Sequence, residues 1–165
     1  MTKINLPVTV LRVFLAALFA FGLLMQIMSL PGQFGHDAAE APEYAHLSWT
    51  FLVVTELAAL GLQIVIVCIW RLLSMVQKDR IFSEASLVWV DAIVWTFVAG
   101  WAVLVAVSTY ISGFLFFTPE LRDPGLPILL FGFALIATVL VLLMVILRAL
   151  LRQATVLRAD MDVVI

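Results

Sequence analysis

The chain has 165 residues, of which 65% are hydrophobic and 12% are charged, and its mean hydropathy is +1.19. No soluble domain of this length can cover so much apolar surface, so the composition excludes a water-soluble globule and indicates a protein that lies in lipid. The net charge of −2 provides no overall field for nucleic acid, and the single cysteine, Cys68, excludes an internal disulfide and a cysteine-based metal cluster.

The first predicted element is an apolar run over residues 8–29. It supplies the ~20 residues with which a helix crosses the hydrocarbon core of a bilayer, and it lacks the alternation of a barrel strand. A transmembrane helix is therefore expected, with Pro7 and Pro31 marking its ends. Arg12 lies about one turn inside this run, and Gln26 lies near its far end.

A polar segment leads from this run to a second one over residues 49–73. The segment contains five groups of the kind that ligate metal ions: His36, Asp37, Glu40, Glu43 and His46. Because Pro42 interrupts any helical register there, we expect solvated side chains of an outer loop, and no metal or cofactor is predicted. In the second run Glu56, Gln63 and Trp70 follow at intervals of seven, so all three lie on one helix face.

The stretch VQKDRIFSEAS, Val76 to Ser86, interrupts the apolar sequence with four charged side chains. Its length and polarity predict a turn between two membrane helices. Ser83 is the expected N-cap of the next helix, with Glu84 in its first turn. Phe82 and Leu87 have the spacing of a hydrophobic staple, which would fix the angle at which the chain re-enters the membrane.

The third apolar run, residues 87–117, is long enough that we expect it to tilt or to end in the interface near Gly113. Asp91 lies about one turn inside it, at the same depth as Arg12. A charge within a span is costly and normally faces a protein partner or water. We therefore expect Asp91 to pair with Arg12, or with Arg71 or Arg148, as a structural clamp; the alternative is that each charge reaches the membrane surface independently.

Polar side chains of three helices fall at similar depth in the outer half of the membrane. By residue counting, Glu56, Gln63 and Gln26 are level with three hydroxyl residues of the third run, Ser108, Thr109 and Ser112. This arrangement predicts a polar pocket around Glu56 that serves as a binding or proton-relay site. The competing interpretation is structural, with Glu56 hydrogen-bonded or protonated inside the bundle.

The fourth run, residues 126–147, is followed by the tail RALLRQATVLRADMDVVI, residues 148–165. The tail keeps a helical rhythm, with one apolar stripe: Leu147, Leu150, Leu151, Ala154, Leu157 and Met161. This helix either lies on the lipid surface, packs on the inner turn or binds a partner. Pairs of alanines four residues apart in the first and third runs have the spacing that permits close helix approach, which would allow a homodimer.

The cations set the predicted topology. Eight of the nine lie on one side of the four runs: Lys3, Arg12, Arg71, Lys78, Arg80, Arg148, Arg152 and Arg158. The positive-inside rule makes this side cytoplasmic, with only Arg122 outside. The prediction is an all-α integral membrane four-helix bundle, a single domain over residues 1–165, N-in and C-in, with the last helix extending into the cytoplasm.

Several segments carry a resemblance to a known family. The inner turn KDRIFSEASLVWVDAI, the outer PEYAHL and the tail, in the context of four spans, resemble the family catalogued as domain of unknown function 2975, over roughly residues 8–165. The resemblance implies a small multi-pass protein of the bacterial inner membrane, often encoded beside a small helix-turn-helix regulator. It implies no catalytic residues.

These observations favour a non-enzymatic membrane protein that contacts a cytoplasmic regulator or signalling protein, with no direct nucleic-acid contact. Its expected partner surface is formed by the inner turn and the tail: Lys78, Asp79, Arg80, Phe82, Arg152 and Arg158. The alternative is a small transporter or export accessory that uses Glu56 as its intramembrane polar site. An enzyme of lipid or envelope metabolism is disfavoured, because the sequence offers no credible nucleophile and base or metal constellation.

Overall fold

The computed structural model of the chain describes residues 5–78, 83–118 and 124–163, and every regular element in these ranges is helical. In chain order the elements are α1 (Asn5–Leu24), the π-helical turn η1 (Met25–Ser29), α2 (Leu30–Glu40), the 3₁₀ turn η2 (Pro42–Tyr44), α3 (Ala45–Val76), α4 (Glu84–Phe117) and α5 (Gly125–Val163). Four helical rods are long and apolar enough to cross a membrane, which confirms the predicted all-α fold.

The first membrane helix continues past the proline that was expected to end it. Because α1, η1 and α2 follow one another without a break, the predicted end near Ser29 is wrong. Pro31 has no backbone N–H, and its ring crowds the carbonyl group four residues earlier. The π-helical turn just before it, in which the Leu30 N–H donates to the Met25 carbonyl, widens the helix and lets it continue through the proline.

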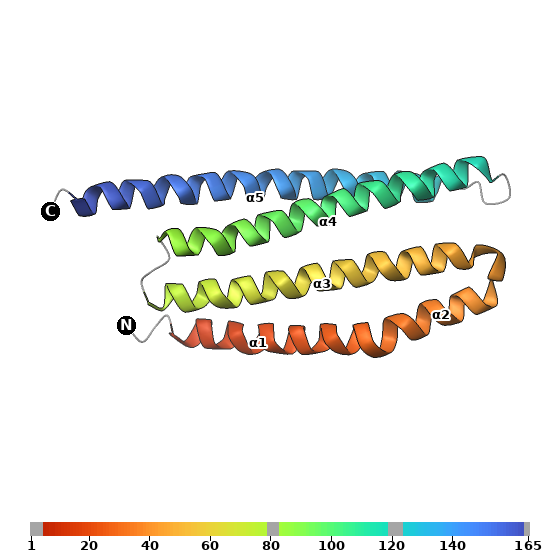
Figure 1. Cartoon of the computed structure of the whole chain (residues 1–165), viewed down its shortest axis with the longest axis horizontal. Coiled ribbons are helices and arrows are strands. Elements are labelled where there is room, and N and C mark those ends of the chain that lie inside the picture. Colours follow the sequence, from red (N-terminus) through yellow and green to blue (C-terminus); the bar gives the residue numbers. More distant parts are fainter. Residues whose placement is uncertain (1–4, 79–82, 119–123, 164–165) are drawn as a thin grey trace.

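The four rods pack in chain order. Figure 1 shows them side by side, with α1 and α2 against α3, α3 against α4, and α4 against α5. In the described ranges the extensive helix contacts all join rods that are neighbours along the chain. The start of α1 and the end of α5 lie at the same end of this layer. We call it the cationic end, because Arg12, Arg71 and Arg148 lie towards it, and we call the other the opposite end.

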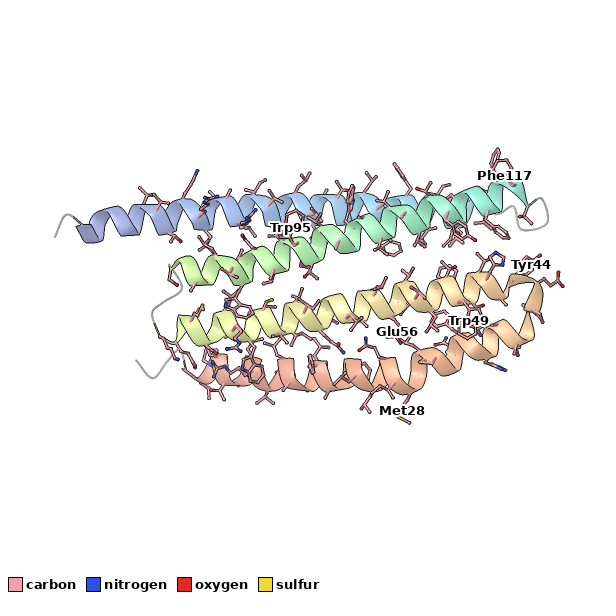
Figure 2. All side chains as sticks on the ribbon, viewed as in Figure 1. Met28, Tyr44, Trp49, Glu56, Trp95 and Phe117 are labelled. Carbon is pink, nitrogen blue, oxygen red and sulfur yellow. The ribbon has the colours of Figure 1, made fainter. Side chains whose placement is uncertain are left out.

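Most large apolar side chains point out of the layer. Figure 2 shows Met28 and Phe117 directed away from it, and these side chains are 73% and 83% exposed. The buried apolar residues in the described ranges are few and scattered: Val8, Leu15, Ile66, Cys68, Val94 and Ile111. Such an outward apolar surface is stable only where lipid is the solvent, so the chain is a multi-pass membrane protein.

The packing face of α5 has a seven-residue period. Ala134, Val141, Arg148 and Thr155 are buried or half-buried, whereas the residue that follows each of them is exposed. This spacing places one seam of α5 along α4, as in coiled-coil packing. The seam continues unbroken from the membrane span into the predicted tail, so span and tail are one helix.

At the start of α4, Ser83 occupies the predicted N-cap position with an extended backbone, but its side chain makes no capping hydrogen bond. Instead its carbonyl accepts hydrogen bonds from the Ser86 N–H (3.0 Å) and the Ser86 hydroxyl (2.7 Å). Ser86 is fully buried. The hydrophobic staple expected between Phe82 and Leu87 lies partly outside the described residues.

Candidate functional site

The strongest polar contact between two helices joins α4 to α5. Both Arg148 Nε and Arg148 Nη2 donate to the carboxylate of Asp91, the latter over 2.7 Å to Oδ2, in a two-pronged ion pair. Of the three cations that the sequence offered to Asp91, the structure places Arg148 against it. The planar guanidinium suits this geometry, because it presents two parallel N–H groups to the two carboxylate oxygens.

The other two cations tie the remaining helices together. Arg12 of α1 donates from Nη2 to the Ser74 hydroxyl of α3 over 2.9 Å and lies over the Trp70 ring at 5.9 Å. Arg71 of α3 lies over the Trp89 ring of α4 at 5.5 Å. Each is within the range of cation–π attraction. Arg12 and Arg71 therefore contact the next rod along the chain, and neither contacts Asp91.

Together these contacts form a belt across all four rods, which we call the cationic belt and define by seven residues: Arg12, Trp70, Arg71, Ser74, Trp89, Asp91 and Arg148. Three cations against one anion leave it positive, which suits the phosphate level of a bilayer. Its geometry fixes the helices relative to one another at one depth. Ser74 was not predicted from the sequence, although it lies one turn after Trp70 and so shares its face.

The predicted polar pocket is split between two helix interfaces. Gln63 of α3 donates from Nε2 to Gln26 Oε1 of η1, and a methyl group at Gly22 would lie 3.6 Å from the same nitrogen. Glu56 points into the space between α3 and the first rod (Figure 2) and forms no hydrogen bond with any residue the structure describes. This cluster therefore belongs to the interface of the first two rods.

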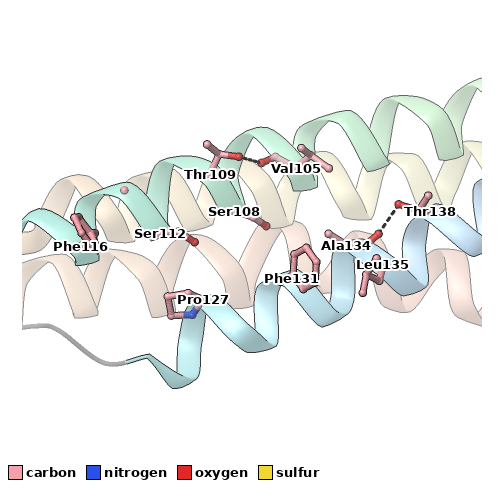
Figure 3. Close-up of a pocket in the computed structure, with 11 residues that line it drawn as sticks. Val105, Ser108, Thr109, Ser112, Phe116, Pro127, Phe131, Ala134, Leu135 and Thr138 are labelled. Carbon is pink, nitrogen blue, oxygen red and sulfur yellow. Dashed lines mark hydrogen bonds between the residues drawn. The ribbon is translucent and has the colours of Figure 1, made fainter.

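The three hydroxyl residues expected in the same pocket lie elsewhere. Ser108, Thr109 and Ser112 line a cavity between α4 and α5 (Figure 3), so their expected proximity to Glu56 is wrong. The reason is the packing order of the rods, because α4 turns this face to α5 and not to α3. Residue counting did not identify the neighbouring helix that these hydroxyl groups face.

The predicted partner surface is described only in part. Lys78, at the end of the turn that follows α3, and Arg152 of α5 are exposed. Asp79, Arg80 and Phe82 lie outside the described residues, and so does the side chain of Arg158. The apolar residues of the tail stripe differ in burial. Leu151 and Ala154 are half-buried on the α4 side, whereas three others are exposed: Leu147, Leu150 and Leu157.

The candidate metal ligands near the opposite end do not gather. His36 and Glu40 lie one turn apart on α2, not in a loop, and form an exposed contact of 3.3 Å. His46 instead packs edge-on against Phe114 of α4, with ring centroids 5.1 Å apart. Within the described ranges no three acidic, histidine or cysteine side chains are grouped as a metal ion would require.

Comparison with models of protein families gives a match. The family model described as "Protein of unknown function (DUF2975)" matches residues 32–165, a range that includes the whole of α3, α4 and α5. No curated protein and no solved structure matches the chain.

Proposed function

Because the chain belongs to the DUF2975 family of proteins of unknown function, we propose that it is a non-enzymatic membrane protein that holds a cytoplasmic protein at the bilayer. The binding surface is the part of α5 beyond Arg148, together with the neighbouring turn between α3 and α4. The proposed partner is a small helix-turn-helix regulator of transcription, the class of protein that the family resemblance associates with such chains.

The observation that carries this proposal is the apolar face of α5 beyond the cationic belt. Val156 and Leu157 are 54% and 63% exposed. Leu150 is also exposed, and it lies seven residues before Leu157 and so on the same side of the helix as Leu157. At about 1.5 Å per residue, the helix from Arg148 to Leu157 extends roughly 14 Å past the belt. Because α5 continues without a break, these side chains are carried away from the hydrocarbon core and need a different apolar contact.

The charge distribution supports a cytoplasmic position for this end. Eight of nine cations lie on the predicted inner side, and the three belt arginines lie towards the end at which α5 finishes. When a reporter protein is fused after Ile165, we expect its activity to show that the C-terminus lies in the cytoplasm. A periplasmic signal from that fusion would contradict the orientation and with it the proposed partner.

The binding experiment begins with the genes that adjoin this one: any small helix-turn-helix protein encoded there is coexpressed with the full chain, which is then purified in mild detergent. The double variant Val156→Glu/Leu157→Glu is expected to reduce the copurified regulator at least ten-fold, because two carboxylates enter an apolar contact. The matched control Val156→Ile/Leu157→Met keeps the surface apolar and is expected to retain the regulator. Equal recovery with the Glu variant, or no recovery with the wild type, would contradict the proposal.

One observation favours the alternative, a small transporter. Glu56 is an intramembrane carboxyl group without a hydrogen-bond partner among the described residues, and it lies across from the π-helical turn η1, a feature that is frequent at functional sites. Glu56→Gln keeps the size of the side chain but removes its proton. If transport is the function, this variant abolishes proton flux in proteoliposomes and leaves regulator binding unchanged.

A further inference from the structure

One face of α3 is exposed along most of its length and ends in an arginine. Because the rods form a single layer (Figure 1), an inner rod such as α3 keeps a face that no other rod covers. Arg71 is exposed on this face. Before it, at alternating intervals of four and three residues, come five apolar side chains that are 45–57% exposed: Val53, Leu57, Leu60, Ile64 and Val67. These six residues, which we call the α3 stripe, present lipid with a long apolar surface that ends in one positive charge.

Aromatic side chains place Arg71 at the level of the lipid headgroups. Trp49 and Trp70, which are 52% and 38% exposed, lie 21 residues apart on α3, a distance of roughly 32 Å along the helix. On α4, Trp89 and Tyr110 have the same separation. This distance matches the ~30 Å hydrocarbon core, at whose two boundaries tryptophan and tyrosine are enriched. Arg71 directly follows Trp70, so its side chain lies at the boundary on the cationic side, next to the lipid phosphates.

Arg71 has no anionic partner among the described residues. Its guanidinium lies over the Trp89 ring at 5.5 Å but forms neither an ion pair nor a hydrogen bond with any residue that the structure describes. Arg148 differs, because the carboxylate of Asp91 neutralises it. The N–H groups of Arg71 are thus available to an anion, and a phosphate group matches their planar fork. A zwitterionic lipid carries a cation beside its phosphate, so this site favours a lipid with a net negative charge.

We propose that the α3 stripe binds an anionic phospholipid of the leaflet at the cationic end, with the lipid phosphate on Arg71 and one acyl chain along the apolar part of the stripe. From Arg71 to Leu60 the helix rises by roughly 16 Å, which is about the depth of one leaflet in a ~30 Å core. The stripe contains no residue of the proposed regulator surface. The failure of either proposal therefore leaves the other standing.

The test uses the full chain, washed free of native lipid in a nonionic detergent, and measures bound lipid by native mass spectrometry. Phosphatidylglycerol and phosphatidylcholine with the same two oleoyl chains are titrated separately, so that only the headgroup differs. We expect phosphatidylglycerol to occupy one site about ten-fold more tightly than phosphatidylcholine does. Water-soluble glycerol phosphate in ten-fold excess should not displace it, because it has no acyl chain for the stripe. Equal affinity for the two lipids, or displacement by glycerol phosphate, would overturn the proposal.

Three variants, each checked for wild-type elution on gel filtration, test the position of the phosphate. Arg71→Gln removes the charge and should weaken phosphatidylglycerol binding about ten-fold, to the level of phosphatidylcholine. Arg71→Lys keeps the charge but not the planar fork, so a loss of about three-fold is expected. Arg152→Gln is the matched control and should bind normally, because Arg152 is also exposed but lies on α5, outside the stripe. Unchanged binding in Arg71→Gln, or an equal loss in Arg152→Gln, would refute the site. The comparison of the two lipids on the wild type tests the proposal even if a variant fails to fold.

Discussion

From the hydrogen bond between the Gln63 and Gln26 side chains we predict how much stability the protein loses when one of the two amides is removed. Gln63 is 8% exposed, and Gln63→Leu leaves the Gln26 amide without its partner. Losing one partner of a buried hydrogen bond costs about 1–3 kcal/mol, whereas hydrogen bonds between membrane helices average about 0.6 kcal/mol and reach about 1.7 kcal/mol. Because Gln26 is only half-buried and can turn towards another group, we expect Gln63→Leu to cost ~1 kcal/mol.

The double variant Gln26→Leu/Gln63→Leu removes both amides and should be close to the wild type in stability, since two leucines suit a lipid-facing interface. The free energy of unfolding is measured for all four proteins by titrating dodecyl sulfate into mixed micelles and following helix content. Gln26→Leu should cost about as much as Gln63→Leu, because it leaves the buried Gln63 amide without its partner, so a coupling of roughly 2 kcal/mol is expected from this cycle. Ile64→Leu, a lipid-facing change next to Gln63, is the control. Purely additive effects of the two substitutions would refute the reasoning that the amides stabilise the interface together.

Two further predictions concern the other helix interfaces. Asp91→Ala is expected to reduce folded yield and the midpoint of thermal unfolding in detergent sharply, because it leaves Arg148 without its carboxylate. The double variant Asp91→Ala/Arg148→Ala should recover part of the yield and part of the midpoint. Equal yield for the wild type and Asp91→Ala would contradict the clamp. Gly61→Leu should lower the unfolding midpoint, since even a methyl group there would lie 3.4 Å from Thr96 Cγ2. Gly100→Leu is the control and should leave the midpoint unchanged, because a methyl group at Gly100 would meet nothing within 4 Å. Equal midpoints for the two variants would contradict close packing of α3 on α4.

The membrane fold could be predicted because bilayer thickness dictates the length of each apolar run, and every predicted run falls inside an observed helix. The end of the first helix could not, because a proline reads as a boundary unless the preceding turn widens, and nothing in the sequence identifies the π-helical turn before Pro31. Sequence alone therefore gave the right number of rods with one wrong boundary.

For the candidate site, the sequence predicted which side chains share a helix face but not which helix that face contacts. Spacing placed Glu56 and Gln63 on one face, and the structure agrees, but the sequence does not say which neighbour that face meets. The same limit applies to Asp91, for which three arginines were equivalent by depth until the packing order placed Arg148 beside it. Thr138, which accepts a hydrogen bond from Trp101 Nε1 over 2.8 Å, was missed because a single threonine in an apolar run gives no periodic signal.

The order in which the rods pack affects how the protein is made. Each rod contacts extensively only the rods before and after it in the chain, so a newly inserted helix finds its partner already in the membrane. No extensive contact within the described ranges has to wait for the last rod to pair with the first. Biogenesis can therefore proceed stepwise as the chain leaves the translocon, and a gene divided at the turn between α3 and α4 should yield two hairpins that reassemble when they are made together.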